Sequence, residues 1–436
     1  MERTFICENV TSNESGHLCF AGQDVVNLTA KYGTPLYLMD EERIRQRCRT
    51  FKDAVHTCFG DNAYIAYASK AASFKEIYRI MKSEGMYVDV VSSGEIYTAS
   101  QAGFPLSNSL FHSNNKTDDD IKYAMDNDVG YFVVDNEEEL FAIQKEAKKR
   151  NITQKILLRI TPGIDSHTFA AVATGKVDSK FGSAIKTGQA EQITKTALNQ
   201  KNIKLSGYHC HIGSQIFSTE VFLRAAKIMI GFIADIKNTV GYETNVLDMG
   251  GGFGVRYLPT DPVIDIKSTI ISIGETIKEL CKTFGVKLPT IIFEPGRSIV
   301  ADAGMTVYTV GTVKRIPEFV NYVSVDGGMT DNVRYAMYKS NYTLVTANKI
   351  DETCNIKASI VGRCCESGDI IQENVPMPST VCRGDTIACL TTGAYNYSMA
   401  SNYNRIPRPP IVMLKGGKSR IVVRRETLSD ICNLDE

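Results

Sequence analysis

The chain has 436 residues, of which 43% are hydrophobic, so it can bury a sizeable core in two or three domains. Lysine plus arginine and aspartate plus glutamate both number 49, a neutral balance that disfavours bulk binding to nucleic acid or membrane surfaces. The start, MERTFICENVTSNESG, does not look like a secretory signal, and no apolar run approaches the roughly 20 residues that span a bilayer. The 12 cysteines are scattered without a CxxC pair, which favours free thiols and a cytoplasmic location.

Short apolar runs alternate with amphipathic stretches over the first two thirds of the chain. We predict eight strands there, at Ala63–Ala68, Tyr87–Val91, Ser109–His112, Tyr131–Asp135, Ile156–Ile160, Gly207–Ile212, Val246–Gly250 and Thr290–Glu294. The helical stretches between them include Ser73–Glu84, Thr117–Asp126, Glu137–Lys149 and Ile266–Thr283. Eight such strand–helix units are typical of an α/β fold of the closed (β/α)8 TIM-type barrel, although an open doubly wound sheet has the same pattern.

One predicted helix shows a clear apolar stripe, formed by Leu140, Phe141, Ile143 and Ala147. After about residue 298 strand-like runs replace the helical periodicity, with turn sequences such as DGG, RGD and KGG between them. These runs are Met305–Val313, Tyr322–Asp326, Tyr342–Thr346, Ile356–Val361, Thr386–Leu390, Ile411–Leu414 and Arg420–Arg424. We therefore predict a barrel at residues 36–297 and a mostly antiparallel, sandwich- or barrel-like β-domain at residues 1–35 plus 298–436.

Lys70 directly follows the first predicted barrel strand. The carboxyl ends of barrel strands carry the active sites of this architecture, so polar residues at these ends are candidates for catalysis. Lys70 lies between an apolar strand and Ala-Ala-Ser, which indicates a partly dry setting rather than an ordinary solvated lysine. Desolvation lowers the pKa of a lysine amine and makes it a nucleophile able to form an imine.

Three later strand ends carry further polar groups. His209 and His211 share one strand face, which suits a ring stacked on a flat cofactor, or core histidines, better than a metal site without other ligands. Gly250–Gly252 can present backbone N–H groups to a phosphate or simply form a tight turn. Glu294 and Arg297 could pair with each other, but a ring nitrogen needs a carboxylate and a phosphate favours arginine. Together these groups are what pyridoxal phosphate requires.

Ten segments together resemble those of the fold-type III pyridoxal-phosphate-dependent decarboxylases, which share an alanine racemase-like barrel, and among them the diaminopimelate decarboxylases. In chain order they are YASKAA, DVVSSGE, FHSNNKT, DSKFG, HCHIGSQI, DMGGGFG, EPGRSIVADAG, VDGGMTDNVRYAMY, CESGD and GAYNYSMASNYN. The resemblance extends from GTPLYLMD near residue 33 to Pro409. It implies decarboxylation of meso-2,6-diaminopimelate to L-lysine and carbon dioxide, the last step of lysine biosynthesis.

The resemblance also implies residue roles. Lys70 would hold pyridoxal 5′-phosphate as a Schiff base, and Cys365, beside acidic residues in a polar turn, would protonate the decarboxylated carbon. The cofactor-binding set would be Lys70, His211, Ser214, Gly250, Gly251, Gly252, Glu294, Pro295, Gly296, Arg297 and Tyr395. The substrate-binding set would be Arg297, Arg334, Tyr338, Glu366 and Tyr395. In the family, the residues matching Cys365 and Glu366 come from the other subunit, so the resemblance implies a homodimer that needs no metal, nucleic acid or membrane.

The substrate depends on what the site recognises at the far end of the molecule. Diaminopimelate has a distal amine and a distal carboxylate, so its site needs an anion partner, which Arg334 and Tyr338 beside Glu366 would supply. The alternatives are a decarboxylase of ornithine, arginine, D-lysine, D-ornithine or a carrier-bound amino acid, a barrel racemase, and a non-catalytic relative. Many family members have LKAN where this chain has SKAA, which leaves the neighbouring substrate contacts open. The lysine, the cysteine and the phosphate arginine are all present, which argues against a non-catalytic relative.

Overall fold

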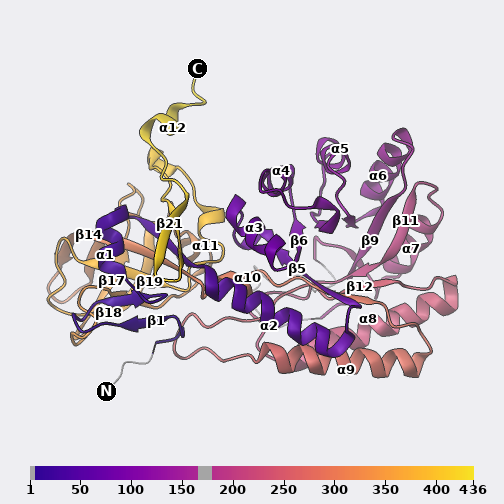
Figure 1. The fold of residues 1–436 in the computed structure, drawn as a ribbon, viewed down its shortest axis with the longest axis horizontal. Coiled ribbons are helices and arrows are strands. Elements are labelled where there is room, and N and C mark those ends of the chain that lie inside the picture. Colours follow the sequence, from indigo (N-terminus) through magenta and orange to yellow (C-terminus); the bar gives the residue numbers. More distant parts are fainter. Residues whose placement is uncertain (1–4, 165–178) are drawn as a thin grey trace. The chain divides into compact units, whose positions relative to one another are not determined.

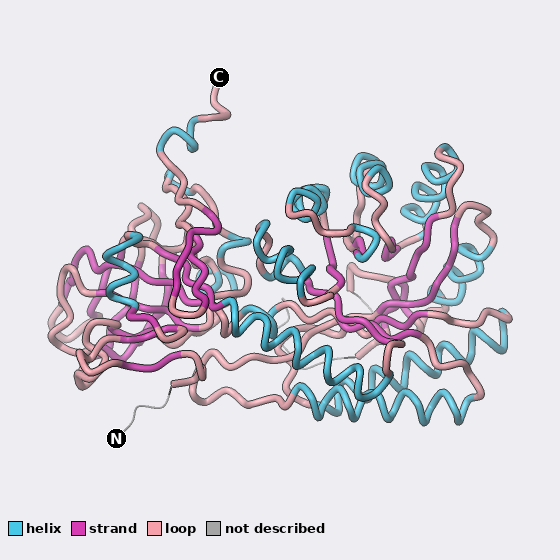
Figure 2. Tube along the Cα trace, in the orientation of Figure 1, coloured by secondary structure: helices cyan, strands magenta, loops and turns pink. Residues whose placement is uncertain are grey.

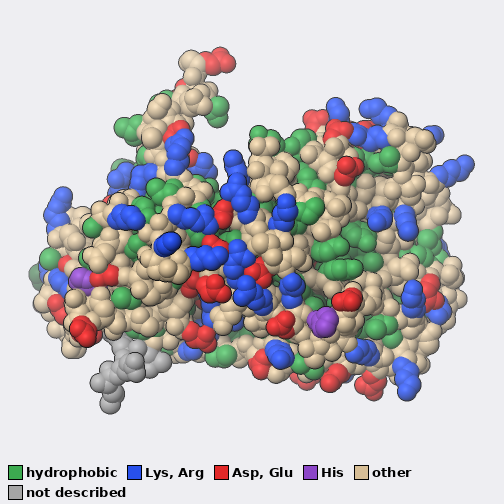
Figure 3. All heavy atoms as spheres, in the orientation of Figure 1, with side chains coloured by type: hydrophobic (Ala, Val, Ile, Leu, Met, Phe, Trp, Pro, Cys, Tyr) green, Lys and Arg blue, Asp and Glu red, His purple; other side chains and the backbone are tan. Residues whose placement is uncertain are grey.

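A computed structural model describes residues 5–164 and 179–436, which form two compact units (Figure 1). The barrel unit comprises residues 47–254 and 263–298, and the β-unit comprises the chain up to Gln46, residues 255–262 and residues 299–436. Lysine and arginine side chains intermix with aspartate and glutamate over the face seen in Figure 3, and the two groups number 49 each in the full sequence. Within the described ranges, no helix has the length and apolar character needed to cross a membrane.

The barrel unit is a closed ring of parallel strands. Around the ring these are β5 (Ala63–Ala68), β6 (Tyr87–Val90), β7 (Ser109–Phe111), β8 (Tyr131–Val134), β9 (Gln154–Thr161), β11 (Ile203–His209), β12 (Val246–Asp248) and β13 (Thr290–Phe293). Every strand pairs in parallel with the next, β13 pairs with β5, and the short β10 (Ser183–Ala184) adds to β9. The predicted TIM-type barrel is therefore confirmed, and the open sheet is ruled out.

Helices follow the strands and cover the outside of the ring (Figure 2). They are α2 (Glu41–Phe59), α3 (Lys75–Ser83), α4 (Ser93–Gln101), α5 (Asp118–Asp126), α6 (Glu137–Lys149), α7 (Gln189–Leu198), α8 (Thr219–Val240) and α9 (Ile266–Phe284), with a 3-10 turn η2 at Leu106–Asn108. Neighbours in this series from α3 to α7, and α8 with α9, pack side by side. The start of α5 is set by a capping box, in which Thr117 and Asp120 each accept the other's backbone N–H.

The stripe predicted on α6 is correct except at Phe141. Leu140, Ile143 and Ala147 are fully buried, whereas Phe141 is 48% exposed. Successive helical residues are about 100° apart, so Phe141 is turned away from the face that its neighbour Leu140 buries. Inside the ring, a layer of apolar side chains drawn from six strands fills the barrel: Ala66, Leu110, Val133, Leu157, Val246 and Ile292.

β11 differs most from its predicted range: the sequence pattern predicts residues 207–212, and the strand lies at Ile203–His209. Gly207 lies within the strand, where a Cβ would stand 1.8 Å from the backbone oxygen of Val246, so this glycine permits a close approach and does not begin the strand. Beyond His209 the chain turns, and Gly213 and Gln215 adopt positive φ angles of 139° and 60°. This turn carries two of the predicted cofactor residues.

The β-unit contains a sheet of order β18-β17-β15-β14-β4-β20-β21, and β19 joins β14 to β16. Its strands are β4 (Leu36–Asp40), β14 (Gly304–Arg315), β15 (Asn321–Val325), β16 (Leu344–Thr346), β17 (Ile356–Val361), β18 (Ile370–Met377), β19 (Thr386–Leu390), β20 (Ile411–Lys415) and β21 (Lys418–Val423). All pairs are antiparallel except β15–β17 and β4–β20. The predicted mostly antiparallel β-domain is confirmed.

The remaining elements are short. The chain begins with β1 (Val10–Ser12), β2 (Leu18–Phe20), β3 (Gln23–Asp24) and α1 (Val25–Tyr32), and ends with α12 (Leu428–Cys432). Between them lie α10 (Arg297–Val300), α11 (Arg334–Tyr338) and the 3-10 turns η4 (Tyr397–Met399) and η5 (Tyr403–Arg405). The sequence pattern missed α11 and β18; in β18 three polar residues follow the apolar start, and Asn374 adopts a positive φ of 57° that breaks the alternation.

Candidate active site

The predicted cofactor residues of the barrel unit gather at the carboxyl ends of its strands. Lys70 lies in the 3-10 turn η1 (Ser69–Ala71) directly after β5, and Glu294 is the first residue after β13. Gly250–Gly252 follow β12, and Arg297 begins α10. Because the strands are parallel, these ends meet on one rim, which is where barrel enzymes place their catalytic groups.

Lys70 is exposed in this chain, so the partly dry setting predicted for it is wrong here. The physical reason is local: the flanking Ser69 and Ala71 are packed inward and buried, and the turn projects the lysine beyond the strand end. The positive charge of Lys70 still acts on buried neighbours, where it opposes the raised pKa values of Asp89 and Glu95. Lys70 therefore lies close enough to Asp89 and Glu95 for its charge to act on both carboxyl groups.

His211 carries a neutral ring. Burial lowers its pKa well below the usual range, and the charge of Lys70 lowers it further. The backbone N–H of Gly251 donates to Nδ1 of His211 across 3.3 Å, which orients the imidazole. A neutral, oriented imidazole beside Lys70 is suited to stacking on a flat aromatic cofactor.

Gly250–Gly252 form a cradle that has no room for side chains. A Cβ would lie 2.5 Å from the backbone oxygen of Cys210 at Gly250, 2.2 Å from that of Glu294 at Gly251 and 2.4 Å from that of Gly213 at Gly252. Gly250 and Gly252 also need positive φ angles, 67° and 103°. Backbone N–H groups in such a turn can bind an anion.

Substituting Gly251→Ala is expected to lower the affinity for pyridoxal phosphate about 10- to 100-fold, because overpacking of this kind costs about 1–3 kcal/mol. The matched control is Gly231→Ala in α8, where a Cβ meets nothing within 4 Å. Titration of the cofactor-free proteins with pyridoxal phosphate measures the effect. Equal affinities for the two variants would show that the cradle tolerates a methyl group.

Arg297 and Ser214 complete the anion-binding corner. Arg297 is buried, and its Nε and Nη2 donate to the Ser214 hydroxyl at 3.3 and 3.0 Å. The preceding loop is fixed against β5, since the backbone N–H of Ala68 donates to the Pro295 oxygen at 3.2 Å and a Cβ on Gly296 would lie 2.8 Å from that of Ala68. A guanidinium, a hydroxyl and a glycine cradle fit a phosphate, so the residues present fit pyridoxal phosphate.

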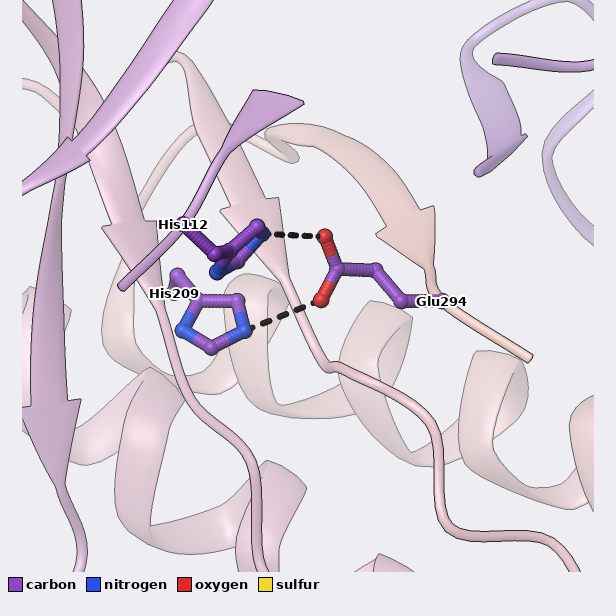
Figure 4. Close-up of side chains that lie close together, drawn as sticks. All are labelled: His112, His209 and Glu294. Carbon is purple, nitrogen blue, oxygen red and sulfur yellow. Dashed lines mark hydrogen bonds and ion pairs between the residues drawn. The ribbon is translucent and has the colours of Figure 1, made fainter. Parts of the chain in front are cut away.

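Glu294 is held by two histidines (Figure 4). Its Oε1 accepts from Nε2 of His112 at 2.7 Å and its Oε2 accepts from Nε2 of His209 at 3.1 Å. Burial raises the pKa of Glu294, but the histidines outweigh it and hold that pKa well below the usual range. Asp248 behaves oppositely, because burial and the negative charge of Glu294 raise its pKa well above the usual range. Glu294 is therefore kept as a carboxylate by its two histidine neighbours.

Glu95 in α4 should make stability depend on pH. Burial, together with the charge of Asp89, raises the pKa of Glu95 from 4.5 to about 7. Between these pH values the folded protein keeps a proton that the unfolded chain has lost. The stability that this carboxyl contributes is therefore full below about pH 4.5 and is lost as the pH rises to about 7.

Glu95→Gln should flatten this dependence by about 1–3 kcal/mol between pH 5 and pH 8, since each pKa unit corresponds to about 1.4 kcal/mol. A glutamine oxygen can still accept the 2.7 Å hydrogen bond from the Val91 N–H. The measurement is the difference in Tm between the two pH values for wild type, Glu95→Gln and the exposed control Glu138→Gln in α6. An unchanged difference in Glu95→Gln would disprove the assignment.

Apart from Arg297, which belongs to the barrel unit, the predicted substrate residues belong to the β-unit, and Arg334 and Tyr338 begin and end α11. The Arg334 guanidinium is buried and lies over the rings of Tyr338 and Tyr395, 5.4 Å from each centroid. Its Nη2 donates to the Ser340 hydroxyl at 3.4 Å, but the buried Nε has no hydrogen-bond partner among the described residues. A buried N–H without an acceptor is costly, so it indicates a place for an anionic ligand.

Cys365 and Glu366 are exposed on a loop that precedes β18. The loop is fixed by Asp369, which is buried and accepts from the backbone N–H groups of Met329 at 2.6 Å and Cys364 at 2.7 Å. The Cys365 N–H donates to the Asn404 side chain at 2.9 Å. The thiol and the carboxylate are therefore presented to the surface on a firmly held turn.

Sequence reasoning assigned no role to four further residues of these groups: Asp89, Glu95, His112 and Asp369. These residues lie in the segments DVVSSGE, FHSNNKT and CESGD, which carry the family resemblance. His112 directly follows its strand, as Lys70 does. The position of His112 at a strand end was thus an available signal. Asp178 of the DSKFG segment lies outside the described residues.

Residues 41–301 match a family model described as pyridoxal-dependent decarboxylase, pyridoxal binding domain. The chain belongs to this family. The diaminopimelate decarboxylase of Bacillus subtilis is 44% identical over 423 residues, which is 97% of this chain and 96% of the relative. The cofactor is pyridoxal 5′-phosphate, as predicted.

Solved structures of the family are similar over the whole chain. The diaminopimelate decarboxylase of M. jannaschii in complex with L-lysine has a TM-score of 0.90 and 31% identity, with 99% of both chains covered. The lysine/ornithine decarboxylase of Vibrio vulnificus in complex with putrescine has a TM-score of 0.76 and 26% identity, with 90% of this chain and 97% of that one covered. This pyridoxal-dependent decarboxylase is a carbon–carbon lyase that acts on an amino acid.

Proposed function

We propose that the enzyme decarboxylates meso-2,6-diaminopimelate to L-lysine and carbon dioxide. The observation that carries the proposal is the buried Arg334 guanidinium, whose Nε has no partner among the described residues. A substrate with a distal carboxylate would supply the missing acceptor, whereas lysine or ornithine would not. The name of the B. subtilis relative and the L-lysine in the M. jannaschii complex support the same substrate.

Pyridoxal phosphate supplies a carbonyl group that takes up the substrate amine and a pyridine ring that accepts the electron pair left by carbon dioxide. We assign the amine of Lys70 to holding the cofactor and releasing it to substrate. Arg297, Ser214 and the glycine cradle would bind the phosphate, and His211 would cover one ring face. Glu294 would keep a proton on the ring nitrogen, and the Cys365 thiol would give a proton to the α-carbon. Arg334, Tyr338, Glu366 and Tyr395 would hold the substrate.

We further propose a homodimer in which Cys365 and Glu366 complete the site of the other subunit. Both side chains are exposed in the single chain, although they carry chemistry that works best away from water. We assign cofactor binding to the barrel unit; of the predicted domain at residues 36–297, residues 36–46 and 255–262 belong to the β-unit instead. All 12 cysteines are free thiols, which supports a reducing compartment such as the cytoplasm.

The test is a substrate panel on the purified enzyme with pyridoxal phosphate. We expect carbon dioxide and L-lysine from meso-diaminopimelate and at least about 100-fold lower kcat/KM for D-lysine, D-ornithine, ornithine and arginine, because a site with an unpaired buried group rejects them. No release from meso-diaminopimelate would refute the proposed substrate. Release from D-lysine at an equal rate would favour the D-amino-acid alternative.

Arg334→Gln is expected to lower kcat/KM for meso-diaminopimelate about 100-fold, since it removes a charge-assisted contact to the distal carboxylate. The slow turnover of D-lysine, which has no such carboxylate, should change by less than about 3-fold. Steady-state kinetics with both substrates measure the difference. Equal losses for both substrates would mean that Arg334 supports the fold and does not read the substrate.

A further inference from the structure

Both carboxylate oxygens of Glu294 are occupied by a histidine donor, in a cluster formed by His112, His209 and Glu294 (Figure 4). All three side chains are buried, and the two imidazole rings meet edge to face with their centroids 4.8 Å apart. The arrangement uses one lone pair on each oxygen and leaves the other pair of each for a third donor. A carboxylate held at both ends has little rotational freedom.

The backbone fixes the positions of both histidines. His209 is the last residue of β11 and is in register with Asp248 of β12. His112 follows β7, and its backbone N–H donates to the oxygen of Val90 at 2.8 Å. The cluster therefore joins the ends of β7, β11 and β13, and the rigid ring of strands sets its geometry.

The distances favour hydrogen bonds over a metal site. The three side chains could each offer one ligand atom within 4.8 Å of the others. Around a tetrahedral zinc ion with bonds of about 2.0–2.1 Å, neighbouring ligand atoms lie about 3.3 Å apart. The 2.7 Å separation between His112 and Glu294 is shorter than this and is the length of a charge-assisted hydrogen bond.

The protonation of His209 agrees with a donor role. Burial lowers its pKa to about 3, so the ring is neutral and has a single N–H. Nδ1 of His209 is buried with no partner among the described residues, whereas Nε2 faces Glu294. Placing the proton on Nε2 satisfies the carboxylate and leaves no buried donor unpaired.

We propose that His112 and His209 are positioning residues that keep Glu294 ionised and aim its free lone pairs at the ring nitrogen of pyridoxal phosphate. The inference rests on the proposed function in placing that nitrogen beside Glu294. A protonated ring nitrogen makes the cofactor a stronger electron acceptor. The two histidines thereby control the cofactor's chemistry through Glu294, without touching substrate.

Nitrogen-15 NMR of the holoenzyme, loaded with pyridoxal phosphate labelled at the ring nitrogen, tests the proposal. His112→Phe keeps a ring but removes the donor, and His112→Gln keeps an N–H near the position of Nε2. We expect a protonated nitrogen signal in wild type and His112→Gln and a shift toward the unprotonated signal in His112→Phe. kcat in His112→Phe should fall about 10- to 100-fold, with KM changed less than about 3-fold. His56→Phe, at an exposed histidine, is the matched control and should behave as wild type.

A second measurement does not need the cofactor. In infrared spectra of the cofactor-free protein, Glu294→Gln identifies the carboxylate band, which should weaken in favour of a carboxylic-acid band in His209→Phe and His112→Phe. An unshifted nitrogen signal in His112→Phe, an unchanged carboxylate band in both variants, or equal defects in His112→Phe and His112→Gln would each overturn the proposal. Failure of the wild type to take up pyridoxal phosphate or to act on diaminopimelate would instead refute the proposed function.

Discussion

Lys70→Ala is expected to abolish covalent attachment of pyridoxal phosphate and to lower kcat at least about 10⁴-fold, the largest effect predicted for any single substitution. We expect no other lysine to take over, because the charge of Lys70, at the end of β5, acts on His211, Asp89 and Glu95. Reduction with borohydride, followed by mass spectrometry, identifies the lysine that carries the cofactor.

The control for this experiment is Lys75→Ala, at the exposed first residue of α3 only five positions away. It should leave cofactor attachment and kcat unchanged. Lys70→Ala leaves the anion-binding corner of Arg297, Ser214 and the glycine cradle unchanged. This variant should therefore still bind pyridoxal phosphate non-covalently. Trapping of the cofactor on any other lysine of the wild type would refute the role of Lys70.

The fold was predictable where local pattern and burial coincide. Each barrel strand is a mostly apolar run, and the predicted and observed ranges of β5, at Ala63–Ala68, are identical. Predictions failed where contacts between distant residues decide the outcome. Gly207 reads as a strand start but is required by the neighbouring Val246 backbone, and Phe141 reads as apolar but turns outward. Neither fact is visible within a window of adjacent residues.

Prediction of the candidate active site from the sequence has the same limit as prediction of the fold. Lys70, Glu294 and Arg297 stand at strand ends, where the barrel architecture itself makes polar residues conspicuous. The role of His112 depends on its 2.7 Å contact with Glu294, which lies 182 positions away in the chain. Asp369 ends the CESGD segment, in which the cysteine is the conspicuous residue, yet Asp369 holds the turn through two backbone N–H groups. For a residue that positions another, the sequence offers at most its place at a strand end, as for His112, and the contact that defines its role is visible only in the fold.

Cys365→Ala should lower kcat for meso-diaminopimelate about 10²- to 10⁴-fold, the range expected when a positioned proton donor is lost. Cofactor attachment at Lys70 should be unaffected, because Cys365 lies on a loop of the β-unit, whereas Lys70 and the proposed phosphate-binding residues belong to the barrel unit. The neighbouring Cys364→Ala is the matched control. Cys364→Ala loses the thiol contact to Asp369 but keeps the backbone N–H that donates to Asp369, so the turn should persist and the enzyme should stay active.

Mixing the purified Lys70→Ala and Cys365→Ala variants tests both residues and the proposed dimer in one experiment. If each site takes its lysine from one subunit and its thiol from the other, subunit exchange between the two inactive variants creates one intact site in every mixed dimer. Half of the dimers are then mixed, and the mixture should recover about a quarter of the wild-type activity. If Lys70 and Cys365 of the same chain serve one site, no mixed dimer has an intact site. Recovery of activity therefore requires that the thiol of one subunit serves the site of the other. If subunit exchange is verified and no activity returns, the contribution of Cys365 to the partner's site is refuted.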